Sequence, residues 1–418
     1  MPWASCSLRF PDETAGACSE QEQNHGSKTA RPMKNVLKIF TILRFAAFSS
    51  GFCLLFASAA AEGVVRSEQA GFRIETVAEG LKNPWGLVKL PDGRFLVTEK
   101  GGGVRIIENG KLLEAPVEGV PTVAVVGQGG LLDIRLHPDF AKNGWIYLAF
   151  SKPLPKGSLT SVVRGRLKGN RLEDIETIFE PPAEEASGRG NHFGCRIVFD
   201  GKGHVFFSIG DRGDVTTPAN QAQRLDNVKG KVHRLNDDGS VPADNPFVNQ
   251  AGARTSIWSY GNRNPQGLAI QPGTGLLWET EHGPRGGDEL NIIRKGENYG
   301  WPVITYGINY SGSPITDHTA QPGMQQPVKY WTPSPAVCGM DFYTGDAFPR
   351  WKGNLFVSAL AQTKLFRLQL DGEKVAHEEI LLGGTGRIRD VRCFDDGFLY
   401  VIYDQDKIVR LVPVDSGT

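Results

Sequence analysis

The sequence has no excess charge of either sign. Its 418 residues contain 46 Lys and Arg against 46 Asp and Glu, and no run of like charge or low-complexity tract stands out. A chain without a net field has no long-range attraction for nucleic acid or for an anionic membrane, so we expect neither as a partner. The composition, 40% hydrophobic and 22% charged, is that of a globular protein with enough apolar material for a large core.

Cysteine is scarce as well. Of the six cysteines, only Cys195, Cys338 and Cys393 lie beyond the N-terminal targeting segment described next. They form no CxxC motif and none has metal-ligand spacing to a histidine, which argues against a cysteine metal site. An odd count leaves two alternatives open, one disulfide or three buried free thiols.

The N-terminal region lacks an apolar run long enough for a comfortable membrane span. A basic segment begins at Met33, the apolar run Phe45–Phe56 follows, and Ala57–Ala61 offers small-residue cleavage sites. This order is typical of a secretory signal peptide, and a membrane anchor is the alternative. We predict a non-native or disordered extension over residues 1–32, a signal peptide over 33–61 and a mature domain over 62–418. The mature protein should be periplasmic or secreted, without stable membrane insertion.

Amphipathic helical patterns are nearly absent, and a β-hairpin pattern returns along the chain instead. Each time, an apolar strand runs into a turn and a second apolar strand follows. The repeats are about 45–75 residues apart, a spacing typical of propellers. This pattern predicts one all-β domain, a six-bladed β-propeller, in preference to a pair of β-sandwiches. The strand pairs are Trp85–Leu90 with Arg94–Thr98, Leu131–Leu136 with Trp145–Phe150, Arg196–Phe199 with His204–Ile209, Gly267–Ile270 with Gly275–Trp278, Gly339–Tyr343 with Asn354–Ser358, and Arg389–Phe394 with Phe398–Tyr403.

The stretch Ile257–Pro302 carries the densest set of polar loop residues. Its hairpin is flanked by Asn262–Gln266, whose guanidinium and amides suit a carboxylated ligand, and by Glu281–Pro284, whose oxygens suit a hard cation such as calcium. Two solvated turns are the alternative. Because propeller loops converge on one mouth, we expect this stretch to form the fourth blade, with both loops facing the same mouth as His192.

Seven motifs in a fixed order carry a family resemblance. They read NPWGLVKLPDGRFLVTEK, GQGGLLDIRLHPDF, NHFGCRIVFD with FFSIGDRG, GNRNPQGLA, EHGPRGGDELN, NYGWP and GRIRDV. From about Glu75 to Val412 the chain resembles the soluble sugar dehydrogenases that depend on pyrroloquinoline quinone (PQQ), the glucose/sorbosone dehydrogenase family. Within that family it is most similar to the aldose sugar dehydrogenases of bacterial periplasms. The family fold is a six-bladed propeller.

The resemblance implies an activity. The expected reaction is oxidation of an aldose at the anomeric carbon to a lactone, by hydride transfer to a quinone carbonyl polarised by calcium (Ca²⁺). His192 matches the family's general base, and imidazole suits that role because its unperturbed pKa lies near neutrality. The electrons leave through an acceptor that the sequence does not identify, and the protein is expected to be a monomer or homodimer.

The resemblance also assigns binding roles by position. The cofactor carries three carboxylates, so several arginines in its pocket would bind it. The Arg-x-Arg spacing on a strand puts two guanidiniums on one face. The cofactor positions are Gln128, Arg263, Asn264, Ala359, Leu360, Ala361, Arg387, Ile388 and Arg389. Calcium is assigned to Gly283 and Pro284, a second calcium site to Glu289 and Tyr299, and sugar contact to Tyr310.

The chain departs from the glucose enzymes at several of these positions. Ala361 replaces their cofactor-binding lysine, with Lys364 three residues on, and Asn191 and Arg212 stand where they have Asp and Gln. These differences argue against a strict glucose enzyme. A calcium-dependent lactonase propeller and a non-catalytic binding propeller are the alternatives, but neither explains His192 together with several arginines around one pocket.

Overall fold

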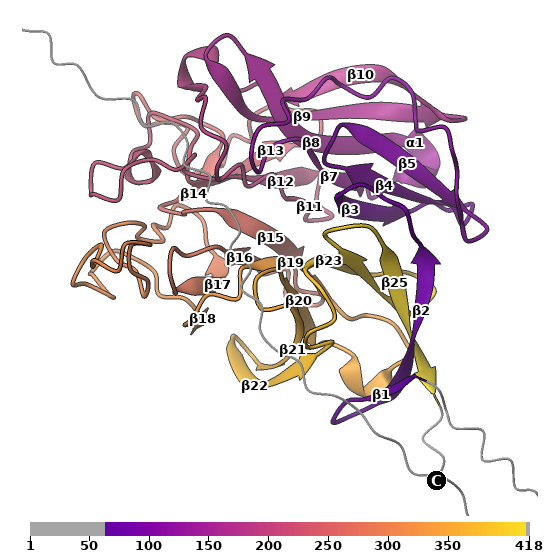
Figure 1. Ribbon diagram of the computed structural model, residues 1–418. Helices are drawn as coiled ribbons and strands as arrows, with labels where there is room; N and C mark the ends of the chain where they lie inside the picture. Colours follow the sequence, from indigo (N-terminus) through magenta and orange to yellow (C-terminus); the bar gives the residue numbers. More distant parts are fainter. Residues whose placement is uncertain (1–62, 415–418) are drawn as a thin grey trace, which may run out of the picture. The chain divides into compact units, whose positions relative to one another are not determined.

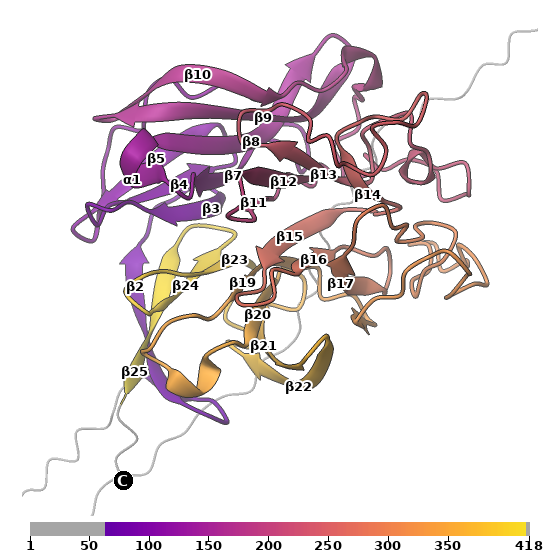
Figure 2. The same ribbon diagram turned by 180° about the vertical axis from the view of Figure 1, so that it is seen from behind.

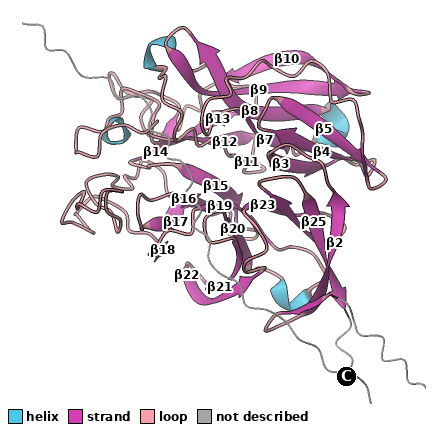
Figure 3. Ribbon diagram, viewed as in Figure 1, coloured by secondary structure: helices cyan, strands magenta, loops and turns pink. Residues whose placement is uncertain are grey.

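The computed structural model describes residues 63–414, so the predicted N-terminal extension and signal peptide lie outside the described part. Almost all regular structure there is β-strand (Figure 3). Helix is confined to the four-residue α1 (Phe140–Asn143) and to three 3₁₀ turns, Ala183–Glu185, Gln221–Gln223 and Pro349–Trp351. Over residues 63–414, no helix has both the length and the apolar character needed to cross a membrane.

The described strands form six antiparallel sheets, each of which is one blade of a propeller (Figures 1 and 2). From the inside outward, the first blade contains β3 (Pro84–Lys89), β4 (Phe95–Glu99), β5 (Gly103–Glu108) and β6 (Lys111–Leu112), and the second β7 (Leu131–Leu136), β8 (Trp145–Leu154), β9 (Gly157–Lys168) and β10 (Arg171–Phe179). The third contains β11 (Ile197–Phe199), β12 (His204–Ile209), β13 (Lys231–Asn236) and β14 (Ile257–Tyr260), and the fourth β15 (Pro265–Ile270), β16 (Leu277–Glu281), β17 (Asp288–Ile293) and β18 (Lys329–Trp331). The fifth contains β19 (Val337–Phe342), β20 (Leu355–Ala359), β21 (Lys364–Asp371) and β22 (Lys374–Leu381), and the sixth β23 (Ile388–Cys393), β24 (Leu399–Tyr403), β25 (Ile408–Val414), β2 (Gly71–Ala78) and β1 (Val64–Arg66).

The inner strands β3, β7, β11, β15, β19 and β23 contact one another in cyclic order, with β23 returning to β3. The ring closes in the sixth blade, where β2 from the start of the described chain pairs with β25 from its end, from Gly71 opposite Val414 to Ala78 opposite Ile408 (Figure 1). The predicted all-β, six-bladed propeller is therefore confirmed.

Local turn chemistry explains why the predicted strand pairs formed. In the first blade, the Asp92 carboxylate accepts the Arg94 backbone N–H at 3.0 Å, and Gly93 takes a φ of +89°, which glycine adopts without strain. The inner strand β3 is buried over Pro84–Val88, so it reads as a continuous apolar run. The outer strand β22 alternates between exposed and covered residues, as expected for a strand with one solvated face.

One predicted boundary is wrong. The stretch Ile257–Pro302 does not form a single blade, because Ile257–Tyr260 is β14 and pairs with β13 of the third blade. The fourth blade begins at Pro265 and takes its outer strand from Lys329–Trp331. The chain passes from the outermost strand of one blade to the innermost strand of the next, so a run of neighbouring strands in sequence need not belong to one blade.

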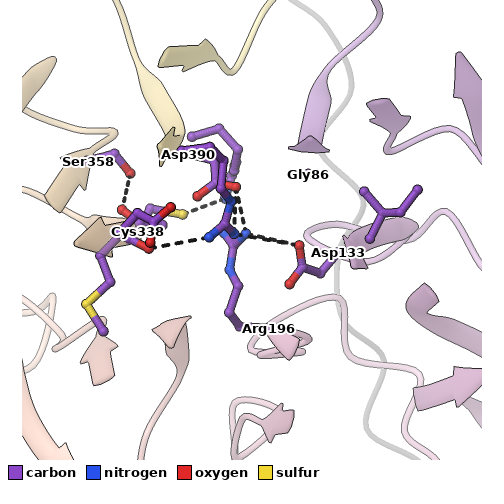
Figure 4. Close-up of polar contacts among 12 residues, drawn as sticks. Gly86, Asp133, Arg196, Cys338, Ser358 and Asp390 are labelled. Atoms are coloured by element: carbon purple, nitrogen blue, oxygen red, sulfur yellow. Dashed lines mark hydrogen bonds and ion pairs between the residues drawn. The ribbon is translucent and has the colours of Figure 1, made fainter. Parts of the chain in front are cut away.

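A buried ion cluster joins the inner strands near the centre of the ring (Figure 4). The Arg196 guanidinium contacts Asp133 of β7 at 3.2 Å and Asp390 of β23 at 3.0 Å, and all three side chains are fully buried. Arg196 also lies over the ring of Trp85 in the first blade, 4.0 Å from its centroid. A Cβ at Gly339 would collide with the Asp390 carboxylate. These contacts thus join the inner strands of five blades, all except the fourth.

Candidate active site

His192 sits in the loop that leads into β11, where one neighbouring loop holds its side chain and another holds its backbone N–H. Its Nδ1 lies 2.6 Å from Asp211 Oδ1, and its backbone N–H donates to Gln128 Oε1 at 2.8 Å. The residue is 9% exposed and has a φ of +53°, a left-handed conformation that few non-glycine residues adopt. The imidazole is therefore fixed in place rather than free on a surface loop.

The partners of Asp211 define the tautomer of His192. An ionised carboxylate only accepts hydrogen bonds, and Asp211 accepts from the Gly213 backbone N–H at 2.8 Å, Trp301 Nε1 at 2.8 Å and Asn220 Nδ2 at 3.2 Å. His192 Nδ1 must therefore carry its proton toward Asp211, which leaves the lone pair on Nε2. Sequence analysis missed Asp211, because nothing in the FFSIGDRG motif indicates which loop its side chain meets.

The electrostatics of this pair favour a neutral imidazole and an ionised carboxylate. Burial lowers the pKa of His192 below its usual 6.5, and the Arg263 cation adds to this effect while Asp211 opposes it. Burial alone would raise the pKa of Asp211, but the hydrogen bond and charge of His192 bring that pKa below its ordinary value. Near neutral pH the pair therefore combines a proton-accepting Nε2 with a fixed counter-charge.

The main cavity has a volume of about 340 Å³ and is lined by residues on or next to strands of all six blades. Two residues next to His192 line this cavity. Gln128 accepts the backbone N–H of His192, and Phe193 follows His192 in the chain. The full lining is Asn83, Trp85, Lys100, Gly127, Gln128, Leu132, Phe193, Gln266, His282, Ala336, Leu360, Arg387, Arg389 and Asp404. Apolar walls and cations suit a flat anionic ligand.

Arg387 and Arg389 do lie on one side of this cavity, as their alternate spacing predicted. Both guanidiniums contact Asp404, at 3.1 Å for Arg387 and 2.6 Å for Arg389. Arg387 also donates to the Leu360 carbonyl at 3.4 Å, and its side chain remains 44% exposed. Asp404 was not foreseen, because it lies in a loop with no motif, yet it orients both arginines.

The loop Asn262–Gln266 contacts the loop Glu281–Pro284 through side chains and backbone. Arg263 Nη1 donates to the carbonyl oxygens of His282 at 3.0 Å and Gly283 at 2.7 Å. The Glu281 carboxylate accepts the backbone N–H groups of Arg263 at 2.5 Å and Asn264 at 3.2 Å, while burial raises its pKa to about 7. Arg263 lies 5.2 Å from the Trp301 ring, and Trp301 holds Asp211. The two loops and the His192 pair therefore form one connected site.

Three of the four residues assigned to calcium, all except Pro284, line a small crevice next to the main cavity. Gly283, Glu289 and Tyr299 line it together with Arg263, and His282 lines both hollows. The Pro284 carbonyl accepts from Ser334 Oγ at 3.3 Å. Burial and the nearby Glu281 charge raise the pKa of Glu289 well above its ordinary value. The Tyr299 hydroxyl donates to the Ile292 carbonyl at 2.6 Å, so only its other atoms face the crevice.

The remaining predicted positions lie further from the cavity. The side chains of Ala359 and Ile388 pack in the hydrophobic core, Ala361 is exposed and its N–H donates to the Pro335 carbonyl at 2.8 Å, and Tyr310 is 74% exposed. Arg212 stacks on the Phe193 ring, 3.4 Å from its centroid, and so supports one wall from behind. A larger hollow of about 500 Å³ beside β1 and β2 contains none of the predicted site residues.

The three cysteines are free thiols, which settles the alternative left open by their odd count. Burial raises the pKa of Cys195 to about 12, so this thiol stays protonated. Cys338 lies 3.3 Å from Arg389 Nη1 beneath the main cavity.

The chain is similar to known proteins along most of its length. The family profile described as glucose/sorbosone dehydrogenase matches residues 81–410. The aldose sugar dehydrogenase YliI of Escherichia coli is 46% identical over 343 residues, which is 80% of this chain and 91% of the relative. The apo crystal structure of soluble aldose sugar dehydrogenase from E. coli gives a TM-score of 0.78 at 44% identity, covering 82% of this chain and 100% of that one. The PQQ-bound aldose sugar dehydrogenase of Streptomyces coelicolor gives 0.67 at 27% identity, covering 82% and 99%.

Proposed function

The chain belongs to the glucose/sorbosone dehydrogenase family, and on this premise we propose that it is a PQQ-dependent dehydrogenase that oxidises aldoses to lactones. The observation that carries the proposal is the His192–Asp211 pair beside a cavity lined by Arg387 and Arg389. A base and an anion-binding pocket are adjacent, which a lactonase or a binding propeller does not require.

The cavity fits a planar cofactor with several carboxylates. Trp85, Leu132 and Phe193 offer apolar surface, while Arg387 and Arg389 offer forked donors that match carboxylates. Gln128, Arg263, Asn264, and the backbone of 359–361 and 388 complete the proposed set of cofactor-binding positions. When bound, the quinone supplies the hydride acceptor, and calcium supplies a Lewis acid at its carbonyl.

Hard oxygen donors at the proposed calcium site come from the main chain. The Gly283 and Pro284 carbonyls suit calcium, which takes about six to eight oxygen ligands. Among residues 63–414, no group of three or more acidic, histidine or cysteine side chains is placed to hold a metal, so water and cofactor oxygens would supply the other ligands. Glu289 and Tyr299 are the proposed second site. Because burial raises the pKa of the neighbouring Glu281 and Glu289 carboxyls, a cation bound there would displace protons from them.

The chain's own residues perform the proton transfer. His192 Nε2 accepts the proton of the anomeric hydroxyl, and the Asp211 carboxylate stabilises the imidazolium that forms. The low pKa of His192 keeps the imidazole in its accepting form at neutral pH. Tyr310, exposed on the surface, is proposed to contact the sugar.

The test is reconstitution. Purified protein is mixed with PQQ and calcium, its quinone absorbance is followed on addition of a panel of aldoses, and the product is identified as a lactone. Bleaching by an aldose, abolished when calcium is chelated before PQQ is added, is the expected result. Absence of PQQ binding, or a bound quinone that no aldose reduces, would overturn the proposal. Hydrolysis of lactones without PQQ would favour the lactonase alternative.

A further inference from the structure

Lys100 enters the main cavity from the first blade. It directly follows β4, its backbone N–H donates to the Asn83 carbonyl at 3.1 Å, and its own carbonyl accepts from the Leu131 N–H at 3.1 Å. A Cβ at Gly130 would collide with that carbonyl and lie 2.7 Å from Lys100 Cγ. The glycine therefore leaves room for the lysine stem, and the backbone on both sides fixes where the stem starts.

The Lys100 ammonium has no ionic partner among the described residues. Its Nζ donates at 2.6 Å to the carbonyl of Gly127, the residue before Gln128. Lys100 is half-buried, and a charged partner stabilises an ammonium that is partly removed from water more than a neutral partner does. Lys100 therefore retains donor capacity and uncompensated charge beside a residue that contacts His192.

The charges around the cavity do not balance. Its lining includes three cations, Lys100, Arg387 and Arg389, and one carboxylate, Asp404, a difference of two positive charges. Both arginines already share Asp404. Burial and the Arg389 cation lower the pKa of Lys100, and Asp404 only partly offsets them. A multiply charged anion in the cavity would remove this excess.

Lys364, the lysine nearest in sequence to Ala361, does not reach the cavity. Its Nζ donates to Gln362 Oε1 at 2.9 Å, and it is absent from the lining. We propose that Lys100 binds a carboxylate of the anionic cofactor, as the third cation of the main cavity. This inference rests on the proposed function, because it identifies a further residue of the same cofactor site.

The experiment measures binding rather than turnover. Apoprotein with calcium is titrated with PQQ and with PQQ trimethyl ester, which lacks the carboxylate charges, and binding is followed by tryptophan fluorescence because Trp85 lines the cavity. Lys100→Met is expected to weaken PQQ binding about 10- to 100-fold and to leave ester binding unchanged. Lys100→Arg should retain most of the affinity for PQQ, and the matched control Lys364→Met should bind both ligands like the parent protein.

Equal PQQ affinity in Lys100→Met and the parent would overturn the inference while the proposed function stood. An equal loss of affinity for PQQ and its ester would do the same, since it would mean a structural role. A parent protein that binds neither ligand would instead remove the proposed function, and this inference with it. Thermal unfolding of each apo variant, with Lys100→Arg as the conservative replacement, shows whether a loss reflects misfolding.

Discussion

Replacement of Asp211 by Asn tests the proton-transfer pair most directly. The change keeps the shape of the side chain but removes its charge, and an amide offers one acceptor atom where the carboxylate offers two. Four donors converge on Asp211, from His192, Gly213, Trp301 and Asn220. Whichever way the new amide is turned, two of these donors face an N–H group.

The magnitude follows from those contacts. Loss of a hydrogen bond to a charged group costs about 1.5–3 kcal/mol, which lowers kcat about 10- to 150-fold if the whole effect is felt in the transition state. Asp211 raises the pKa of His192 through its hydrogen bond and its charge. Without it that pKa falls further, so the acid limb of the pH profile, already below pH 6.5 in the parent, should move to lower pH.

The assay is kcat against pH for enzyme saturated with PQQ and calcium, with cofactor affinity measured separately. Asp200→Asn is a matched control, because Asp200 holds His204 Nδ1 at 2.7 Å in a similar pair that lies outside the site. The control should keep the kcat of the parent. An Asp211→Asn enzyme with unchanged kcat, or with an acid limb moved to higher pH, would refute the assigned tautomer and the role of the pair.

Three further predictions use other parts of the site and its support. His192→Gln should lower kcat about 100- to 10,000-fold while PQQ titrations stay unchanged, and near-normal turnover would exclude His192 as the base. Arg387→Ala and Arg389→Ala should each weaken PQQ binding about 10- to 100-fold, as measured by titration, and unchanged affinity in both would refute their role. Arg196→Met should cost about 1.5–3 kcal/mol of unfolding free energy in urea, because the buried Asp133 and Asp390 carboxylates lose one cation but keep Arg135 and Arg392, and a loss below about 1 kcal/mol would show that Arg196 adds little to the cluster.

The strand pairs were predictable because their signals are local. Apolar runs and Asp/Gly turns lie next to each other in sequence, and the Asp92 turn shows the mechanism in a single hydrogen bond. The blade to which each strand belongs was harder to predict, since β14 and β15 are neighbours in sequence but lie in different sheets. The boundary depends on which strand pairs with β13, a long-range choice that no turn residue encodes.

The same distinction separates the site residues that were foreseen from those that were not. Arg387 directly precedes β23 and Arg389 lies within it. Their two-residue spacing predicts a common side, and both line the cavity. Asp404 and Asp211 act on side chains 15 and 19 positions away in sequence, at the ends of paired strands that come together when the sixth and the third blade form. A carboxylate of this kind has no local signature, because its function is defined by the partner it reaches.

The two outer glycines of the GQGG segment have a packing role that the sequence alone does not indicate. In sequence Gly127 and Gly130 suggest only a flexible loop, but a Cβ at Gly127 would collide with the Gly190 carbonyl, and one at Gly130 with Lys100. At Gly127 the loop packs closely against the segment before His192, and at Gly130 it packs closely against the first blade. Gln128, between them, is thereby held within 2.8 Å of the His192 N–H. The two glycines are needed for close approach rather than for flexibility, and they place the Gln128 amide and Lys100 around one cavity, with His192 hydrogen-bonded to Gln128.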